Sequence, residues 1–159
     1  MKRLNIVKKI MDKVSDDDIV VTSTGYISRE VYHYKDRDLN FYMMGSMGNA
    51  LAIGIGLAYS LPFKNKVIVI NGDASCLMSL GTLTHDFPAH LFHHILCNGM
   101  HESTGGQKIN ATMLDFFSIN VGNNVWEIEP SDHVPERIPL SPKEITERFR
   151  NAIDVIRHK

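Results

Sequence analysis

Two polar residues that suit a metal ion follow strand-like segments of the sequence. Asp73 comes just after the apolar run 67–70, and Asn98 directly follows the strand-like run 91–97. Carboxylate and amide oxygens are ligands that Mg²⁺ accepts. Gly72 permits a sharp turn before Asp73, and the backbone N–H groups that follow open a predicted helix, whose N-terminus attracts phosphate. This part of the sequence therefore predicts a magnesium ion held against phosphate oxygens.

Two more glycine-containing segments also follow predicted strands, at 23–26 and 44–48. In an open sheet of parallel strands, ligands bind beyond the carboxyl ends of the strands, so we expect all these segments to meet there. A Gly-Asp pair alone is weak evidence, because turns use both residues freely. The pair becomes more specific when Asn98 follows Asp73 by 25 positions, with one helix and one strand between them.

Helical and strand patterns alternate along the chain. We predict strands at 19–22, 40–43, 67–70, 91–97 and 125–128. We predict helices at 4–14, 28–34, 47–60, 76–83, 113–120 (stopped by Gly122) and 142–156, the last begun by a capping box at 141–144. This order predicts an α/β fold with a mostly parallel sheet and helices on both faces.

The composition is that of one globular domain, predicted to span 1–159. Hydrophobic residues make up 43% and charged residues 22% of the 159 residues. The 17 basic and 18 acidic residues give a net charge of −1, so we expect neither a nucleic-acid nor a membrane partner. The N-terminus lacks the apolar core of a signal peptide, and the two cysteines share no metal-ligand spacing, which favours a cytoplasmic protein with reduced thiols.

Several segments resemble the pyrophosphate-binding half of thiamine diphosphate-dependent decarboxylases. Gly72-Asp73 followed by Asn98 resembles their Gly-Asp-Gly…Asn signature, with Ala74 in place of the second glycine. Segments 23–32, 40–58 and 98–107 are similar to the phosphonopyruvate and sulfopyruvate decarboxylases, as is the tail from 137 to 149. The resemblance implies the thiamine diphosphate-binding fold, in its pyrophosphate-type domain.

The resemblance also implies how the cofactor is held. Asp73, Asn98 and the backbone carbonyl of Met100 would ligate Mg²⁺, while the N–H groups of Ala74 and Ser75 would bind the diphosphate. The implied cofactor-binding residues are Thr24, Gly25, Tyr26, Gly45, Ser46, Met47, Gly72, Asp73, Ala74, Ser75 and Asn98.

Two residues are catalytic candidates on the same basis. Met47 would support the bent cofactor, although its spacing alone is more typical of a core residue. His101 would face the substrate as an acid or anion contact, or else be a solvated loop histidine. The residues expected to bind the anionic end of the substrate are Ser103, Thr104 and Gln107.

The glutamate that activates the cofactor in this family has no matching motif in the chain. We therefore expect a pyrimidine-binding partner subunit to supply it; the alternative is a self-sufficient homodimer that uses Glu102. The segment 113–140 is also shorter than in the relatives by about one helix and one strand, so another chain is a candidate to cover that edge of the sheet.

The leading hypothesis is a subunit of a 2-keto acid decarboxylase acting on phosphonopyruvate or sulfopyruvate. The alternative is a non-catalytic thiamine diphosphate-binding or assembly subunit. The histidines between 85 and 101 invite a zinc interpretation, but His93 and His94 point to opposite faces of a strand and cannot ligate one metal from the same face.

Overall fold

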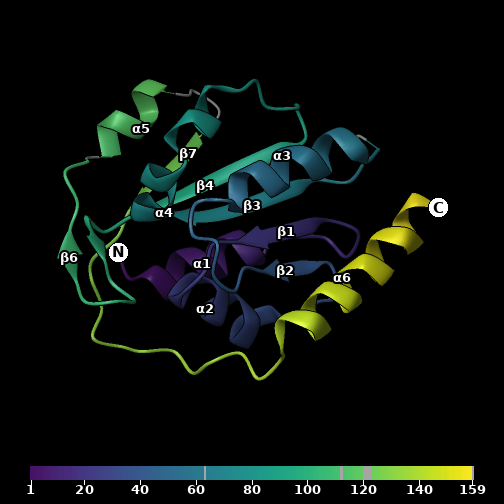
Figure 1. Cartoon of the computed structure of the whole chain (residues 1–159), viewed down its shortest axis with the longest axis horizontal. Coiled ribbons are helices and arrows are strands. Elements are labelled where there is room, and N and C mark those ends of the chain that lie inside the picture. The colour runs from purple at the N-terminus through teal and green to yellow at the C-terminus, as the bar shows by residue number, and fades with distance from the viewer. Residues whose placement is uncertain (63, 112, 120–122, 159) are drawn as a thin grey trace.

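A parallel sheet forms the centre of the molecule (Figure 1). The structure is a computed structural model that describes residues 1–62, 64–111, 113–119 and 123–158. Within these residues the sheet has five strands in the order β2-β1-β3-β4-β7. Their bounds are Ile19–Thr22 for β1, Asn40–Tyr42 for β2, Val67–Gly72 for β3, Leu91–Cys97 for β4 and Asn123–Glu127 for β7. The predicted α/β fold is confirmed.

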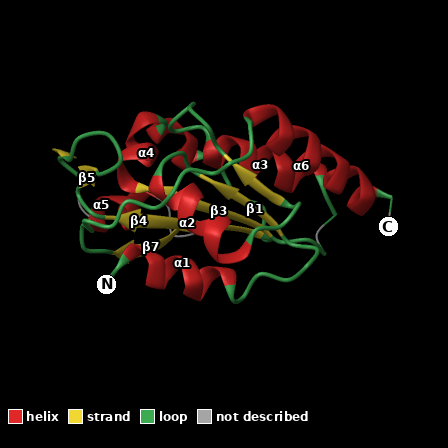
Figure 2. Ribbon diagram, turned by 90° about the horizontal axis from the view of Figure 1, so that it is seen from below, coloured by secondary structure: helices red, strands yellow, loops and turns green. Residues whose placement is uncertain are grey.

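Helices cover both faces of this sheet (Figure 2). On one face lie α1 (Arg3–Met11) and α2 (Tyr26–Lys35), and on the other lie α3 (Ala50–Ser60) and α4 (Asp73–Met78). The remaining helices are α5 (Met113–Ile119), which packs beside β7, and α6 (Pro142–Arg157), which packs near β2. Among the described residues, no helix combines the length and apolar character needed to cross a lipid bilayer.

Side chains of the central strands alternate between two apolar cores. In β1 and β3, Ile19, Val21, Val67 and Val69 pack in the core beneath α3. Their strand neighbours face the opposite core, beneath α1 and α2, and these are Val20, Ile68 and Ile70. Because residues on both faces are buried, these strands read as continuous apolar runs, which is why the sequence predicts them well.

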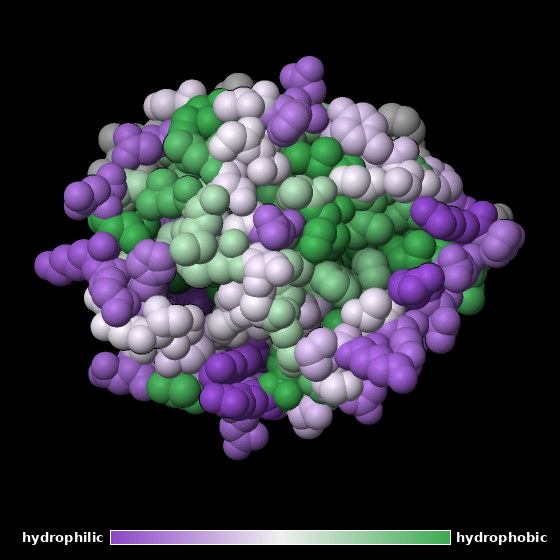
Figure 3. Space-filling model, viewed as in Figure 1, coloured by the Kyte–Doolittle hydropathy of each residue, from purple (hydrophilic) through white to green (hydrophobic). Residues whose placement is uncertain are grey.

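Helix α3 is apolar on every side, yet part of it faces outward (Figure 3). It carries no charged residue, and its Tyr59 side chain is 68% exposed. Met78 at the end of α4 is 60% exposed, and Leu80 in the following turn is 42% exposed. A helix without a polar face is normally covered, so this surface is suited to contact another chain.

Two of the predicted helices begin or end elsewhere. The predicted helix 76–83 is wrong, because α4 starts at Asp73, directly after β3, and ends at Met78. Ser79 leaves the helical region, with φ −136° and ψ 48°, and a short 3₁₀ helix (Leu80–Thr84) follows. The helix predicted from residue 47 begins at Ala50, because the glycine-rich loop before it adopts positive φ angles. The predicted stop at Gly122 lies outside the described residues.

The predicted start of α6 is confirmed. The side chain of Ser141 accepts the N–H of Glu144 at 3.2 Å, and the carboxylate of Glu144 accepts the N–H of Ser141 at 2.7 Å. Pro142 occupies the first helical turn, where its missing N–H has no helical partner to lose.

The segment after β4 contains a small hairpin that the sequence did not predict. Strands β5 (Met100–His101) and β6 (Gln107–Lys108) pair antiparallel. The N–H of Ile109 donates to the carbonyl of Gly99 and extends this pairing. The hairpin holds residues 101–107 over the carboxyl ends of the strands, where the candidate site lies.

Candidate functional site

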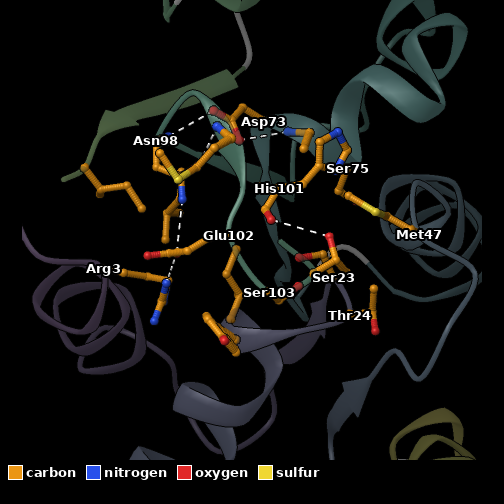
Figure 4. Close-up of a pocket in the computed structure, with 18 residues that line it drawn as sticks. Arg3, Ser23, Thr24, Met47, Asp73, Ser75, Asn98, His101, Glu102 and Ser103 are labelled. Atoms are coloured by element: carbon orange, nitrogen blue, oxygen red, sulfur yellow. Dashed lines mark hydrogen bonds and ion pairs between the residues drawn. The ribbon is translucent and has the colours of Figure 1, made fainter. Parts of the chain in front are cut away.

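The candidate site lies where the chain leaves β1 and β3 in opposite directions. From β1 the chain passes to α2 and β2, whereas from β3 it passes to α4 and β4, on the other side of the sheet. Such a switch leaves a crevice between the two loops at the carboxyl ends of the strands. Ser23 and Thr24 after β1, and Asp73 after β3, line this pocket (Figure 4).

The pocket is small, with a cavity volume of about 70 Å³. Complete small-ligand pockets are usually roughly 300–1,000 Å³. Two larger grooves adjoin it: one of about 490 Å³ shares Thr24 and Met47 with the pocket, and one of about 660 Å³ shares Asp73 and Asn98.

Asp73 is buried at the bottom of the pocket and is held by backbone donors. One carboxylate oxygen accepts the N–H of Ala74 at 2.8 Å. The other accepts the N–H groups of Asn98 at 2.9 Å and Gly99 at 2.7 Å. Burial raises the pKa of the Asp73 carboxyl above its usual value, although these hydrogen bonds oppose the shift. A cation at this position would favour the ionised form.

The N–H of Ala74, which is predicted to bind the diphosphate, donates to Asp73 in this structure. It would have to exchange this partner to reach the diphosphate. The methyl group of Ala74, however, causes no backbone strain. Among the described residues other than glycine, Ser46 alone has a positive φ, so Ala74 adopts an ordinary helical conformation. The side chain of Ser75 accepts the N–H of Gly48 at 3.1 Å and donates to Asn71, which ties α4 to the loop before α3.

Asn98 lies beside Asp73, as predicted from their strand ends. Its Oδ1 accepts the N–H of Met100 at 3.1 Å, and its Nδ2 donates to Glu102 at 3.1 Å. Met100 also lines the pocket. In the described part of the chain, no three His, Cys, Asp or Glu side chains gather into a metal-binding cluster. The donors here are one carboxylate and neutral oxygens, a set that suits Mg²⁺ better than a transition metal.

The loop after β1 approaches the hairpin closely at Gly25. This residue has φ +94°, and an added Cβ would lie 2.8 Å from Oγ of Ser103. Thr24 accepts the N–H of Gly45 through its hydroxyl at 3.3 Å and so joins the loops after β1 and β2. The ring of Tyr26 lines the pocket and lies 5.0 Å from the guanidinium of Arg3. The space beside Gly25 therefore admits glycine alone.

In the loop before α3, three residues around Met47 have positive φ angles. Gly45 and Gly48 have φ angles of +79° and +102°, and Ser46 has φ +46°. Met47 is half-buried and points into the pocket. Gly45 lies on an adjoining groove, whereas Ser46 is exposed and does not line the pocket. Of these residues, the structure brings only Met47 to the pocket.

Residues of the hairpin loop divide into two groups. His101, Ser103 and Thr104 line the pocket, and the hydroxyl of Thr104 donates to the carbonyl of His101 at 3.4 Å. Gln107 lies on β6 outside the pocket lining, with its side chain beside Gly105. Gln107 is thus separate from Ser103 and Thr104 in the pocket lining, and its contact with the substrate stays a prediction.

A buried charge cluster next to the pocket was missed from the sequence. It consists of Arg3, Glu30 and Glu102 and joins α1, α2 and the hairpin. Nη2 of Arg3 donates to Glu30 at 2.9 Å, and Nη1 donates to Glu102 (Figure 4). These residues lie far apart in the chain, and no spacing pairs Arg3 with Glu30 or Glu102, which belong to two different segments of the family resemblance. The charge pattern at residues 2–9 is typical of a solvated helix. Only the tertiary arrangement brings them together.

The two adjacent histidines of β4 lie in different environments. His93 is fully buried beside Asn71, whereas Nδ1 of His94 accepts the indole N–H of Trp126 at 3.1 Å. Each ring is thus directed to its own side of the strand, as the alternation of strand side chains predicts.

Comparisons with known proteins agree with this geometry. The family model described as thiamine pyrophosphate enzyme, C-terminal TPP binding domain, matches residues 22–132. The chain is 38% identical over 156 residues to the sulfopyruvate decarboxylase subunit beta of Methanocaldococcus jannaschii, covering 96% of this chain and 78% of that protein. It is 40% identical over 116 residues to the phosphonopyruvate decarboxylase of Streptomyces viridochromogenes, covering 71% of this chain and 29% of that protein.

The fold is also found among solved structures. An X-ray structure from Mycobacterium smegmatis, described as that of a thiamin diphosphate-dependent enzyme, superposes with a TM-score of 0.57. The match covers 81% of this chain and 31% of that one, at 14% sequence identity, which shows the shared fold. The family match spans most of the chain, including β3, β4 and the loops after β1 and β3 that line the pocket, and the chain therefore belongs to the thiamine pyrophosphate enzymes, as a C-terminal TPP-binding domain.

Proposed function

We propose that this chain is the pyrophosphate-binding subunit of a two-chain, thiamine diphosphate-dependent 2-keto acid decarboxylase that acts on sulfopyruvate or phosphonopyruvate. The observation that carries the proposal is the pocket between the loops after β1 and β3, with Asp73 and Asn98 side by side in it. The relatives with these substrate names match the part of the chain that builds this pocket.

Asp73, Asn98 and the carbonyl of Met100 would hold Mg²⁺ and, through it, the diphosphate. Three N–H groups already fix the carboxylate of Asp73, so its position would change little on binding. Thr24, Gly25 and Tyr26 line the opposite wall, where the lack of a side chain at Gly25 keeps the wall close to the hairpin. Met47 would support the folded cofactor from the side of α3.

The chemistry that bound thiamine diphosphate supplies is uptake of the electron pair released as CO₂ leaves a 2-keto acid. The hairpin would hold the substrate over this position. The exposed hydroxyl of Ser103 can donate to the anionic group of the substrate, and that of Thr104 can do so once it releases the carbonyl of His101. His101, at the same wall, is placed to contact the substrate as an acid or as an anion-binding group.

A partner subunit would supply the activating glutamate. Both pocket-side glutamates of this chain are already engaged: Glu30 with Arg3, and Glu102 with Arg3, Asn98 and the N–H of Ser131. A carboxylate held by three donors is poorly placed to act on a cofactor ring, which argues against a homodimer that uses Glu102. Exposed Met78 and Leu80, beside the loop that carries Gly48, support a second chain on this side.

The proposal is tested with the complex that copurifies with the tagged full chain. With Mg²⁺ and thiamine diphosphate, we expect CO₂ release from sulfopyruvate or phosphonopyruvate and none from pyruvate, which lacks the anionic group at C3. Equal rates with all three acids would contradict the substrate assignment. Tight cofactor binding without CO₂ release from any acid would instead identify a non-catalytic binding subunit.

A further inference from the structure

The side-chain amide of Asn98 is held in one orientation by its two neighbours. Its Oδ1 accepts the N–H of Met100, and its Nδ2 donates to Oε2 of Glu102, each at 3.1 Å. A backbone N–H only donates and an ionised carboxylate only accepts, so a reversed amide would lose both hydrogen bonds. The oxygen of Asn98 is therefore turned away from Glu102.

Glu102 is fixed in turn by donors on both carboxylate oxygens. Oε1 accepts the N–H of Ser131 at 2.7 Å, and Oε2 accepts Nη1 of Arg3 in addition to the Asn98 amide. The Glu102 side chain is only 12% exposed. The Arg3 guanidinium carries hydrogen-bond donors only, so it holds the Glu102 carboxylate as an acceptor.

Arg3 is also unable to move freely. Its side chain is 3% exposed, its Nη2 pairs with Glu30 at 2.9 Å, and its guanidinium lies over the ring of Tyr26. The orientation of the Asn98 amide thus depends on a chain of buried contacts that begins on α1 and α2.

We propose that Glu102 is a positioning residue that orients the Asn98 amide so that its oxygen can ligate Mg²⁺, and that Arg3 holds the Glu102 carboxylate in place for this task. This inference rests on the proposed function, because it takes Asn98 as a metal ligand. Hydrogen-bond partners of metal ligands fix ligand orientation, and their loss typically lowers metal affinity by about 10–100-fold.

The test compares two glutamates that share the same arginine. Glu102→Leu removes the acceptor that contacts Asn98, whereas Glu30→Leu removes the other partner of Arg3, which does not contact Asn98. Calorimetric titration of Mg²⁺ into the full chain, with thiamine diphosphate present and with any copurifying partner subunit, measures metal affinity without turnover. We expect Glu102→Leu to lower Mg²⁺ affinity by about 10–100-fold. We expect Glu30→Leu to lower the melting temperature while keeping the wild-type affinity.

Each other outcome overturns the inference. Wild-type affinity in Glu102→Leu would show that the amide needs no orientation, and equal losses in both variants would show a general effect of disrupting the buried charges. If Glu102→Leu does not fold by circular dichroism, Glu102→Asp keeps the charge beside Arg3 but withdraws the carboxylate from Asn98. The same loss is expected there, and wild-type affinity would overturn the inference. Failure of the wild-type chain to bind Mg²⁺ with thiamine diphosphate would overturn the proposed function itself.

Discussion

Asp73 combines two tasks that the sequence alone would assign to different residues. It is the proposed metal ligand, and it also accepts three backbone N–H groups that join β3, α4 and the start of the hairpin. Its position at a strand end, taken alone, predicts that its removal leaves the fold intact. Because the residue is buried, the structure instead predicts a cost in stability as well as in binding.

We predict that Asp73→Ala abolishes Mg²⁺-dependent binding of thiamine diphosphate and lowers the free energy of unfolding by about 1–3 kcal/mol, because three N–H groups lose their acceptor. Calorimetry and urea denaturation measure the two effects. Asp154→Ala, at an exposed position of α6, is the control and should change neither. Undiminished cofactor binding in Asp73→Ala would reject the metal assignment.

Met47 is predicted to affect turnover more than affinity. Its side chain lines the pocket from the glycine-rich loop and makes none of the proposed diphosphate contacts. In Met47→Ala the anchoring of the diphosphate should survive, while the support for the folded cofactor is lost, so kcat should fall by a larger factor than the cofactor affinity. Equal losses in the two quantities would identify Met47 as a packing residue whose removal opens a cavity.

His94 should make the stability of the protein depend on pH. Burial lowers the pKa of His94 to about 4, and the charge of Lys13 contributes. The unfolded chain takes up this proton near the ordinary value of about 6.5, so the stabilisation is complete above about pH 6.5 and is lost as the pH falls toward 4.

Between about pH 7 and pH 5, the free energy of unfolding of the wild type should fall by about 2 kcal/mol more than that of His94→Gln. Denaturation curves at the two pH values provide the comparison. Parallel changes in the two proteins would show that His94 does not carry the effect.

At the scale of elements, the packing of α3 depends on one glycine. An added Cβ at Gly54 would lie 2.2 Å from Cγ2 of Val69, whereas nothing lies within 4 Å of the same position at Gly56. We predict that Gly54→Ala lowers the free energy of unfolding by about 1–3 kcal/mol through this clash with β3.

Gly56→Ala is the matched control in the same helix. It adds a methyl group in open space and should raise the stability by up to about 1 kcal/mol, because alanine favours the helix more than glycine does. Equal effects of the two substitutions, measured by urea denaturation, would contradict the close packing of α3 on β3.

The elements that the sequence predicted well are those defined by local pattern. The apolar runs at β1 and β3 and the capping box of α6 need only neighbouring residues to be recognised. The hairpin was missed because its strands have two residues each and depend on pairing across a glycine-rich turn. The break after α4 was missed because the apolar spacing of residues 76, 80 and 83 continues through a short 3₁₀ turn.

The residues of the candidate site also divide into those that could be predicted from the sequence and those that could not. Asp73 and Asn98 could be predicted because parallel strands of one sheet place their carboxyl ends together. The charge cluster of Arg3, Glu30 and Glu102 could not, since buried ion pairs join residues from three distant segments. The position of Gln107 outside the pocket lining could not be predicted either. The turn of the hairpin, and not distance along the chain, decides which side chains line the pocket.

In the molecule as a whole, the region around the pocket is the part that another subunit would complete. Glu30 and Glu102 are engaged within the chain, and the uncharged helix α3, which follows the Met47 loop, is partly exposed. Both observations agree with a half-site that is completed by another subunit, as the proposed function requires.

That claim is tested most directly by measuring CO₂ release from sulfopyruvate and phosphonopyruvate by the purified chain alone, with Mg²⁺ and thiamine diphosphate in excess. We predict no release above the background of Asp73→Ala, and release once the copurifying subunit is added back. Rapid turnover by the chain alone would contradict the account, because it would require an activating carboxylate from this chain itself.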